Sequence, residues 1–131
     1  MTWNMHDKEY DSVLSLPGER RYAYFIKRLA GEELLWSLAG EAGWVLAGDN
    51  EGREVVPVWP HARFAAACAT GEWADTEPRS IELTNWLEKW IPGMLRDRRF
   101  VAVFPTPSDK GVVITPTRLR EDLAEELSLY G

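Results

Sequence analysis

The chain has 131 residues, of which 45% are hydrophobic and 27% charged, and it carries a net charge of −6 at pH 7. That length fits one domain able to bury a core without metal or disulfide, so we expect a single α+β domain over 1–131, with 1–8 as a loose N-terminal tail. The negative charge disfavours nucleic acid and membrane as partners and favours a basic protein. A lone cysteine, no long apolar run and no signal-peptide pattern favour the cytoplasm.

Two helices are predicted at the start of the chain, KEYDSVLSL and ERRYAYFIKRLAG, separated by Pro17-Gly18. The second is expected to end at Gly31, because glycine readily takes the left-handed conformation that closes a helix. Its apolar residues follow the i, i+3, i+4, i+7 spacing of an amphipathic helix. These residues are Tyr22, Phe25, Ile26 and Leu29.

The pattern then changes to three strands, LLWSLA, WVLAG and EVVPVW, joined by the turn-rich GEAG and DNEGR. Such short connections predict an antiparallel meander. Pro57 has no N–H to donate, so the third strand is expected to lie at an edge or to end there.

The next stretch, PHARFAAACATG, predicts a helix that begins at Pro60 and ends at Gly71, and the loop EWADTEPR leads from it to a strand, SIEL. Thr84 or Asn85 is expected to cap a further helix, with a kink or a one-turn break at Pro92. Two strands, FVAVFP and GVVIT, and a last helix capped by Thr115 complete the chain. We therefore predict about five helices packed on a mainly antiparallel sheet of about six strands. The predicted core comprises Phe25, Leu29, Trp44, Val56, Phe64, Ile81, Leu87, Trp90, Val103, Val113 and Leu123.

Three segments carry a resemblance to a bacterial family, domain of unknown function 2750. They are RYAYFIKRLA, PVWPHARFAAACATGEWADTEPRSIELTNWLEKW and VAVFPTPSDKGVVITP, and together they extend from about Arg21 to Leu127. The run from Trp59 to Trp73 is the most specific part. The resemblance implies the fold and a bacterial, cytoplasmic setting, and it carries over no catalytic or binding residue.

His61 and Cys68 share one face of the helix predicted after Pro60. Their backbones stand roughly 10 Å apart along its axis, whereas a thiol and its base must approach to about 3 Å, so a direct catalytic dyad is not expected. We interpret Cys68 as a small hydrophobic residue packed against the sheet. For His61 two readings stay open, a hydrogen bond that fixes the turn and a neutral imidazole acting as donor or base. No ligand spacing and no nucleotide or hydrolase motif occurs, so neither a metal nor a cofactor is expected.

Most of the seven tryptophans are expected in the core, because burial of an aromatic side chain is stabilising. Exposed tryptophan is nevertheless enriched at protein–protein hot spots. We expect Trp73, flanked by Glu72 and Asp75, to face a partner. The leading hypothesis is a non-enzymatic protein-binding module, immunity- or adaptor-like, with an acidic surface. The alternative is a hydrolase-like or small-ligand-binding domain with its site between His61 and the loop Glu72–Glu77. The candidate surface consists of Trp59, His61, Glu72, Trp73, Asp75 and Glu77.

Overall fold

The computed structural model describes residues 4–49 and 51–129, which form one α+β domain. The helices are α1 (Asp7–Leu14), α2 (Gly18–Glu32), α3 (Ala62–Ala67), α4 (Leu83–Asn85), α5 (Ile91–Arg96) and α6 (Pro116–Leu127). The strands are β1 (Leu34–Gly40), β2 (Gly43–Trp44), β3 (Ala47–Gly48), β4 (Glu54–Val58), β5 (Glu77–Glu82), β6 (Phe100–Val103) and β7 (Val112–Ile114). A 3-10 turn (Gly71–Trp73) precedes β5, and a π turn (Trp86–Trp90) joins α4 to α5.

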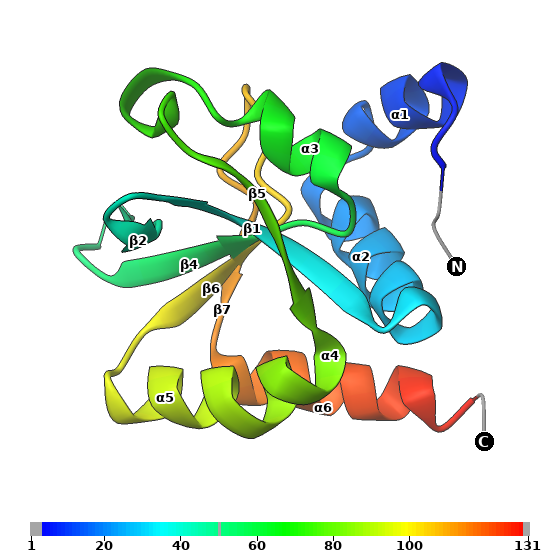
Figure 1. The fold of residues 1–131 in the computed structure, drawn as a ribbon. Coiled ribbons are helices and arrows are strands. Elements are labelled where there is room, and N and C mark those ends of the chain that lie inside the picture. The colour runs from blue at the N-terminus through cyan, green and yellow to red at the C-terminus, as the bar shows by residue number, and fades with distance from the viewer. Residues whose placement is uncertain (1–3, 50, 130–131) are drawn as a thin grey trace.

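The strands form two sheets, ordered β2-β1-β5 and β3-β4-β6-β7, in which every pairing is antiparallel except the parallel pairing of β4 with β6. In Figure 1, α5 and α6 lie side by side beneath the strands, whereas α1 and α3 lie at the opposite end. The predicted α+β class is confirmed. The predicted meander is wrong in one respect, because its middle strand divides into β2, which pairs with β1, and β3, which pairs with β4.

The two sheets meet where β1 crosses the end of β4. Trp36 and Trp59 exchange backbone hydrogen bonds of 2.9 and 2.8 Å, and the Ser37 hydroxyl donates to the Pro57 carbonyl at 2.6 Å. Strand β3 pairs with β4 only as far as Val55. Pro57 lies beyond that point, and its carbonyl is directed at β1. The prediction that β4 is an edge strand or ends at Pro57 is wrong, because β4 lies between β3 and β6, continues to Val58 and pairs Pro57 with Ala102. The proline is tolerated because no residue of β3 pairs with it.

The helix ends depend on tertiary contacts as much as on local residues. Thr115 caps α6 as predicted, its hydroxyl accepting from the Arg118 N–H at 3.1 Å. Helix α2, however, continues past Gly31 and closes at Glu33, which has a φ of 56°. The Glu33 carbonyl accepts from the Leu83 N–H at 3.0 Å, so the alignment of β1 with β5 determines where α2 ends.

Helix α3 is shorter than the predicted Pro60-to-Gly71 helix. It begins after His61, whose Nδ1 accepts from the Arg63 N–H at 3.0 Å, and Cys68 follows its last residue. Gly71 does take a positive φ, 59°, but it begins the 3-10 turn instead of closing α3. The His61 side chain thus caps α3, which begins two residues after the predicted start at Pro60.

The helix expected from residue 84 onward begins at Leu83, and Asn85 has helical dihedrals instead of capping it. Pro92 does not break this helix. Immediately before it, the Ile91 N–H bonds to the Trp86 carbonyl five residues back, in a widened turn. That turn accommodates the proline ring, which clashes with the preceding turn of a regular helix.

Most of the predicted core residues are buried together. The prediction for Trp44 is wrong, because 38% of its surface is exposed. It ends the two-residue strand β2 and packs edge-on against Trp90, with ring centroids 4.9 Å apart. At the N-terminus, Asp7 and Lys8 belong to α1 instead of the expected tail, whose residues 1–3 lie outside the described part of the chain. No helix among residues 4–49 and 51–129 is long and apolar enough to cross a membrane.

Candidate binding groove

A groove of about 830 Å³ lies on one face of the sheet β3-β4-β6-β7. Side chains alternate along these strands, so the opposite face of the same sheet supplies Val56, Val58, Val101 and Val103 to the core. The groove thus lies on the sheet face opposite the core, although Val55, Pro57 and Ala102 on that face are themselves buried. Its floor is apolar and is formed by Ala47, Val55, Pro57, Ala102 and Val113.

One wall of the groove is the segment Thr70–Trp73, which follows α3. The Trp73 N–H bonds to the Thr70 carbonyl at 3.0 Å, and the Trp73 carbonyl accepts from both the N–H and the hydroxyl of Thr76. The Trp73 ring is half-buried against the core. This tryptophan is therefore a fixed part of the wall and not the tip of a solvated loop.

The opposite wall is the loop Pro105–Lys110 between β6 and β7, which rises behind α3 in Figure 1. Thr106 and Asp109 exchange backbone hydrogen bonds of 2.8 and 3.2 Å, which closes the loop into a tight turn. Phe104 enters the loop with a φ of 59°, an uncommon value for a residue other than glycine. At the far end, a Cβ on Gly111 would lie 2.5 Å from the Val103 carbonyl oxygen.

Arg21 on α2 holds this second wall in place. The side chain is 4% exposed and donates to the carbonyls of Phe104 (3.2 Å) and Leu16 (2.6 Å) and to the Asp109 carboxylate (2.5 Å). The hydrogen bond from Arg21 is the largest influence on the pKa of Asp109 and outweighs burial, which raises it; with weaker help from the N–H groups of Gly111 and Lys110, it holds this pKa below its usual value. These three acceptors compensate the buried charge, and two of them, Phe104 and Asp109, tie the loop to α2.

Behind the loop, the Pro105 carbonyl accepts two bonds, one from Trp59 Nε1 at 2.8 Å and one from the Cys68 thiol at 3.5 Å. Trp59 is fully buried, so its assignment to a binding surface is wrong; its indole supports the wall from inside. Burial raises the pKa of the Cys68 thiol to about 11. The thiol therefore stays protonated near neutral pH, as the structural interpretation of Cys68 requires.

Two of the carboxylates that line the groove are engaged within the protein. Asp109 is paired with Arg21, and Asp49 accepts from Arg53 and from backbone N–H groups of its own turn. Burial raises the pKa of Asp49, but these hydrogen bonds outweigh it and keep the pKa below its usual value. Glu72 is exposed and makes no ion pair among the described residues. It is thus the rim carboxylate still available to an incoming group.

The structure divides the predicted surface into separate places. Glu72 and Trp73 line the groove, whereas His61 caps the other end of α3 and does not line it. Asp75 is exposed beyond the groove, and Glu77 is the first residue of β5, opposite Ala39. The site expected between His61 and the Glu72–Glu77 loop is therefore not formed in the groove. Of the two readings of His61, the observed hydrogen bond supports the one that fixes a turn.

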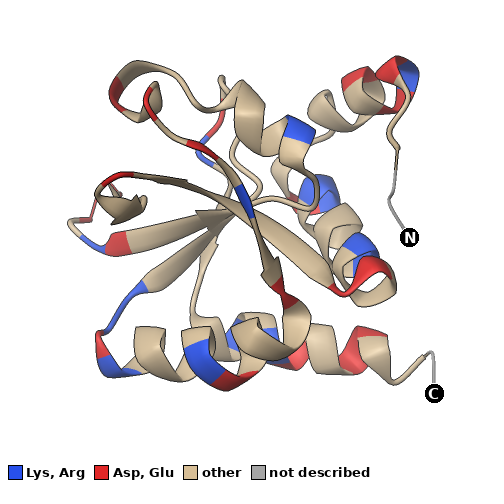
Figure 2. Ribbon diagram, viewed as in Figure 1, with Lys and Arg blue, Asp and Glu red and all other residues tan. Residues whose placement is uncertain are grey.

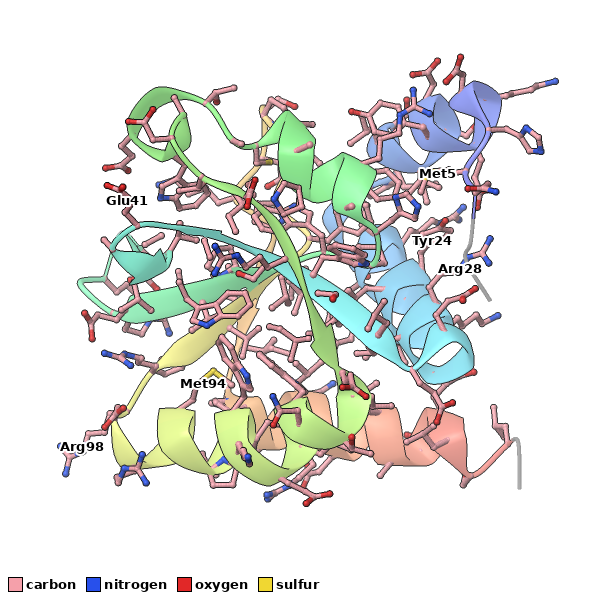
Figure 3. All side chains as sticks on the ribbon, viewed as in Figure 1. Met5, Tyr24, Arg28, Glu41, Met94 and Arg98 are labelled. Atoms are coloured by element: carbon pink, nitrogen blue, oxygen red, sulfur yellow. The ribbon has the colours of Figure 1, made fainter. Side chains whose placement is uncertain are left out.

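Tyr24 and Arg28 border a smaller hollow of about 350 Å³ on the outer side of α2 (Figure 3). The Tyr24 hydroxyl and Arg28 both donate to the Glu9 carboxylate, each at 2.7 Å. Burial, together with the hydrogen bond to Glu9, raises the pKa of Tyr24. These contacts join α1 to α2, so the polar groups of this hollow are used in packing.

Neither Arg21 nor the loop that it holds is indicated by a local sequence pattern. Arg21 adjoins the apolar stripe of α2, where a charged residue ordinarily points to solvent. The segment TPSDK contains the proline, serine and aspartate of a turn and was correctly placed between two strands. Its role as a wall depends on Arg21, 88 positions away from Asp109, and no local pattern reveals such a contact.

No curated protein and no solved structure matches the chain. The model of one family, described as a protein of unknown function (DUF2750), matches residues 22–123. The matched range begins just after Arg21 and includes the floor, both walls and the last turn of the sheet that bears the groove. The chain therefore belongs to the DUF2750 family.

Proposed function

We propose that the protein is a non-enzymatic binding module that holds a segment of a partner protein in the groove. One observation carries the proposal: a hollow of about 830 Å³ with an apolar floor lies between Trp73 and the loop 105–110, and Ala47 and Val113 are the floor residues that stay partly exposed in it. Sheet faces of this kind are normally covered by another layer of the same domain, and apolar surface left accessible is characteristic of an interaction site.

The surroundings of the groove favour binding over chemistry. The Cys68 thiol is protonated, and the carboxylates of Asp49 and Asp109 are committed to Arg53 and Arg21. A nucleophile or general base needs a free lone pair directed at the substrate, whereas the available carboxylate of Glu72 is exposed to solvent at the rim. The bordering side chains instead offer contact area and shape.

The rigidity of both walls supports the same proposal. Trp73 is held by Thr70 and Thr76, and the opposite loop is held by Arg21 and Trp59. Preformed walls reduce the ordering cost of association, which strengthens binding for a given contact area. We place this activity in the bacterial cytoplasm, where the single thiol of Cys68 stays reduced.

The test is to select 12-residue peptides from a random phage-displayed library on the immobilised protein and to measure their affinity for the Trp73→Ala variant. Removal of this wall should weaken the selected peptides by about 2 kcal/mol or more, roughly thirtyfold. Trp44→Ala is the matched control, because Trp44 is also partly exposed but does not line the groove. His61→Ala should likewise leave affinity unchanged.

Thermal melting of each variant separates lost binding from lost folding. The proposal fails if selection yields no peptide, or if the selected peptides bind Trp73→Ala as tightly as the parent protein. If His61→Ala impairs binding and Trp73→Ala does not, the alternative with a site at His61 gains support instead.

A further inference from the structure

We propose that the bound segment is basic, with an apolar side chain on the groove floor and lysine or arginine residues beside it that reach the acidic end of the molecule. This inference rests on the proposed function and specifies the partner. The name acidic end denotes the four residues Glu41, Glu72, Asp75 and Glu77.

Three parts of the chain bring these carboxylates together. Glu41 follows Gly40, where an added Cβ would lie 3.1 Å from the Asp75 carbonyl oxygen. Glu77 is opposite Ala39 in the pairing of β1 with β5. Figure 2 shows acidic positions gathered where the β1–β2 turn meets the loop before β5, and Figure 3 shows the labelled Glu41 directed outward at that end.

The negative charge of this end is largely uncompensated. All four side chains are exposed, and Glu41, Glu72 and Asp75 make no ion pair among the described residues. Glu77 approaches Arg79 only at 4.0 Å. Adjacent like charges raise the local negative potential, which attracts a basic segment and repels an acidic one.

Glu72 belongs both to the acidic end and to the groove rim, and it adjoins Trp73. The apolar and charged subsites are therefore continuous. Because Glu72 itself lines the groove, a basic residue of an extended peptide should lie close in sequence to the apolar anchor. Lys110 borders the groove from the opposite wall, and its positive charge repels basic residues of the peptide there. We therefore expect the basic residues on only one side of the apolar anchor, the side toward Glu72.

The experiment uses the tightest 12-residue peptide from the random library and a copy in which every lysine and arginine is replaced by glutamine. Both are titrated against the parent protein, Glu72→Lys/Asp75→Lys, and the control Glu121→Lys/Glu125→Lys. The control has the same change of charge on exposed positions of α6, away from the acidic end. Circular dichroism establishes that each variant is folded.

The selected sequences should be enriched in lysine and arginine on one side of an apolar residue. Glu72→Lys/Asp75→Lys should weaken binding at least tenfold in 50 mM salt, and the control less than threefold. The difference should shrink in 0.5 M salt, because screening shortens the range of the interaction. The glutamine copy should bind the parent and Glu72→Lys/Asp75→Lys equally.

Two results overturn this inference. One is a set of Trp73-dependent peptides without basic enrichment, and the other is an equal loss in both charge-reversal variants. Either result leaves the proposed function standing, because binding would still depend on Trp73. Failure to obtain any Trp73-dependent peptide instead refutes the proposed function, so the two failures are distinguishable.

Discussion

Arg21 and Asp109 lie 88 positions apart in the sequence, yet a charged hydrogen bond of 2.5 Å joins them. The same guanidinium holds the carbonyls of Leu16 and Phe104, so one buried side chain connects the α1–α2 turn, α2 and the loop between β6 and β7. The shape of the groove therefore depends on a residue that does not line it.

Replacing Arg21 with leucine is expected to lower the free energy of unfolding by about 3 kcal/mol, because a buried network loses its donor. Asp109→Asn should cost about 1 kcal/mol, since Arg21 retains its two carbonyl partners. Urea denaturation measures both changes. Arg20→Leu, at the exposed neighbouring position, is the control and should stay within about 0.5 kcal/mol of the parent. Equal effects at positions 20 and 21 would contradict the role assigned to Arg21.

Stability should fall in acid partly through Asp109. Its folded-state pKa is held below the unfolded value, so its contribution is present above about pH 4 and is lost as the pH falls through the folded pKa. Asp109→Asn should therefore flatten the decline of stability between pH 5 and pH 2, measured as urea midpoints. Some slope should remain, because the pKa of Asp49 is also lowered. Parallel profiles for the parent and Asp109→Asn would argue against a folded-state pair.

Gly111→Ala is expected to destabilise the protein far more than Gly52→Ala. The two glycines have similar φ values, 81° and 77°, so both substitutions carry the conformational cost of about 1–2 kcal/mol. Only at Gly111 does the new methyl also meet backbone, 2.5 Å from the Val103 carbonyl oxygen, whereas nothing lies within 4 Å at Gly52. Thermal melts should show a loss of at least about 3 kcal/mol for Gly111→Ala. Similar melting temperatures for the two variants would show that the loop relaxes.

The Cys68 thiol should react slowly with iodoacetamide at pH 7.5. With a pKa of about 11, its rate should rise about tenfold per pH unit from pH 7 to pH 10, because the thiolate is the nucleophile. The unfolded protein in urea is the control and should react faster at neutral pH. A rate that levels off below pH 9 would show that the thiol is not held protonated by burial.

Local signals predicted much of the secondary structure. Thr115 followed by Pro116 marks the start of α6, and the apolar spacing of α2 places Phe25 and Leu29 in the core. These features succeed because a cap or an amphipathic stripe is encoded within a few residues.

The errors share a different cause. The end of α2 at Glu33 and the burial of Trp59 are both determined by partners distant in the sequence, Leu83 and Pro105. The candidate site also combines features that are encoded locally with features that depend on residues distant in the sequence. Glu72 and Trp73 were identified from their own segment, but the floor and the second wall required the pairing of β4 with β6 and the bond from Arg21.

The parallel pairing of β4 with β6 has a consequence during synthesis. The indole N–H of Trp59 has its acceptor only after Pro105, 46 positions later, has been synthesised. Val55 likewise has its β6 partner only after Phe100 has been synthesised. Until about the last quarter of the chain leaves the ribosome, β4 has no β6 beside it. A nascent chain arrested before β6 should therefore expose the core residues Val56 and Val58 to chaperones, whereas release of the full chain should end that exposure.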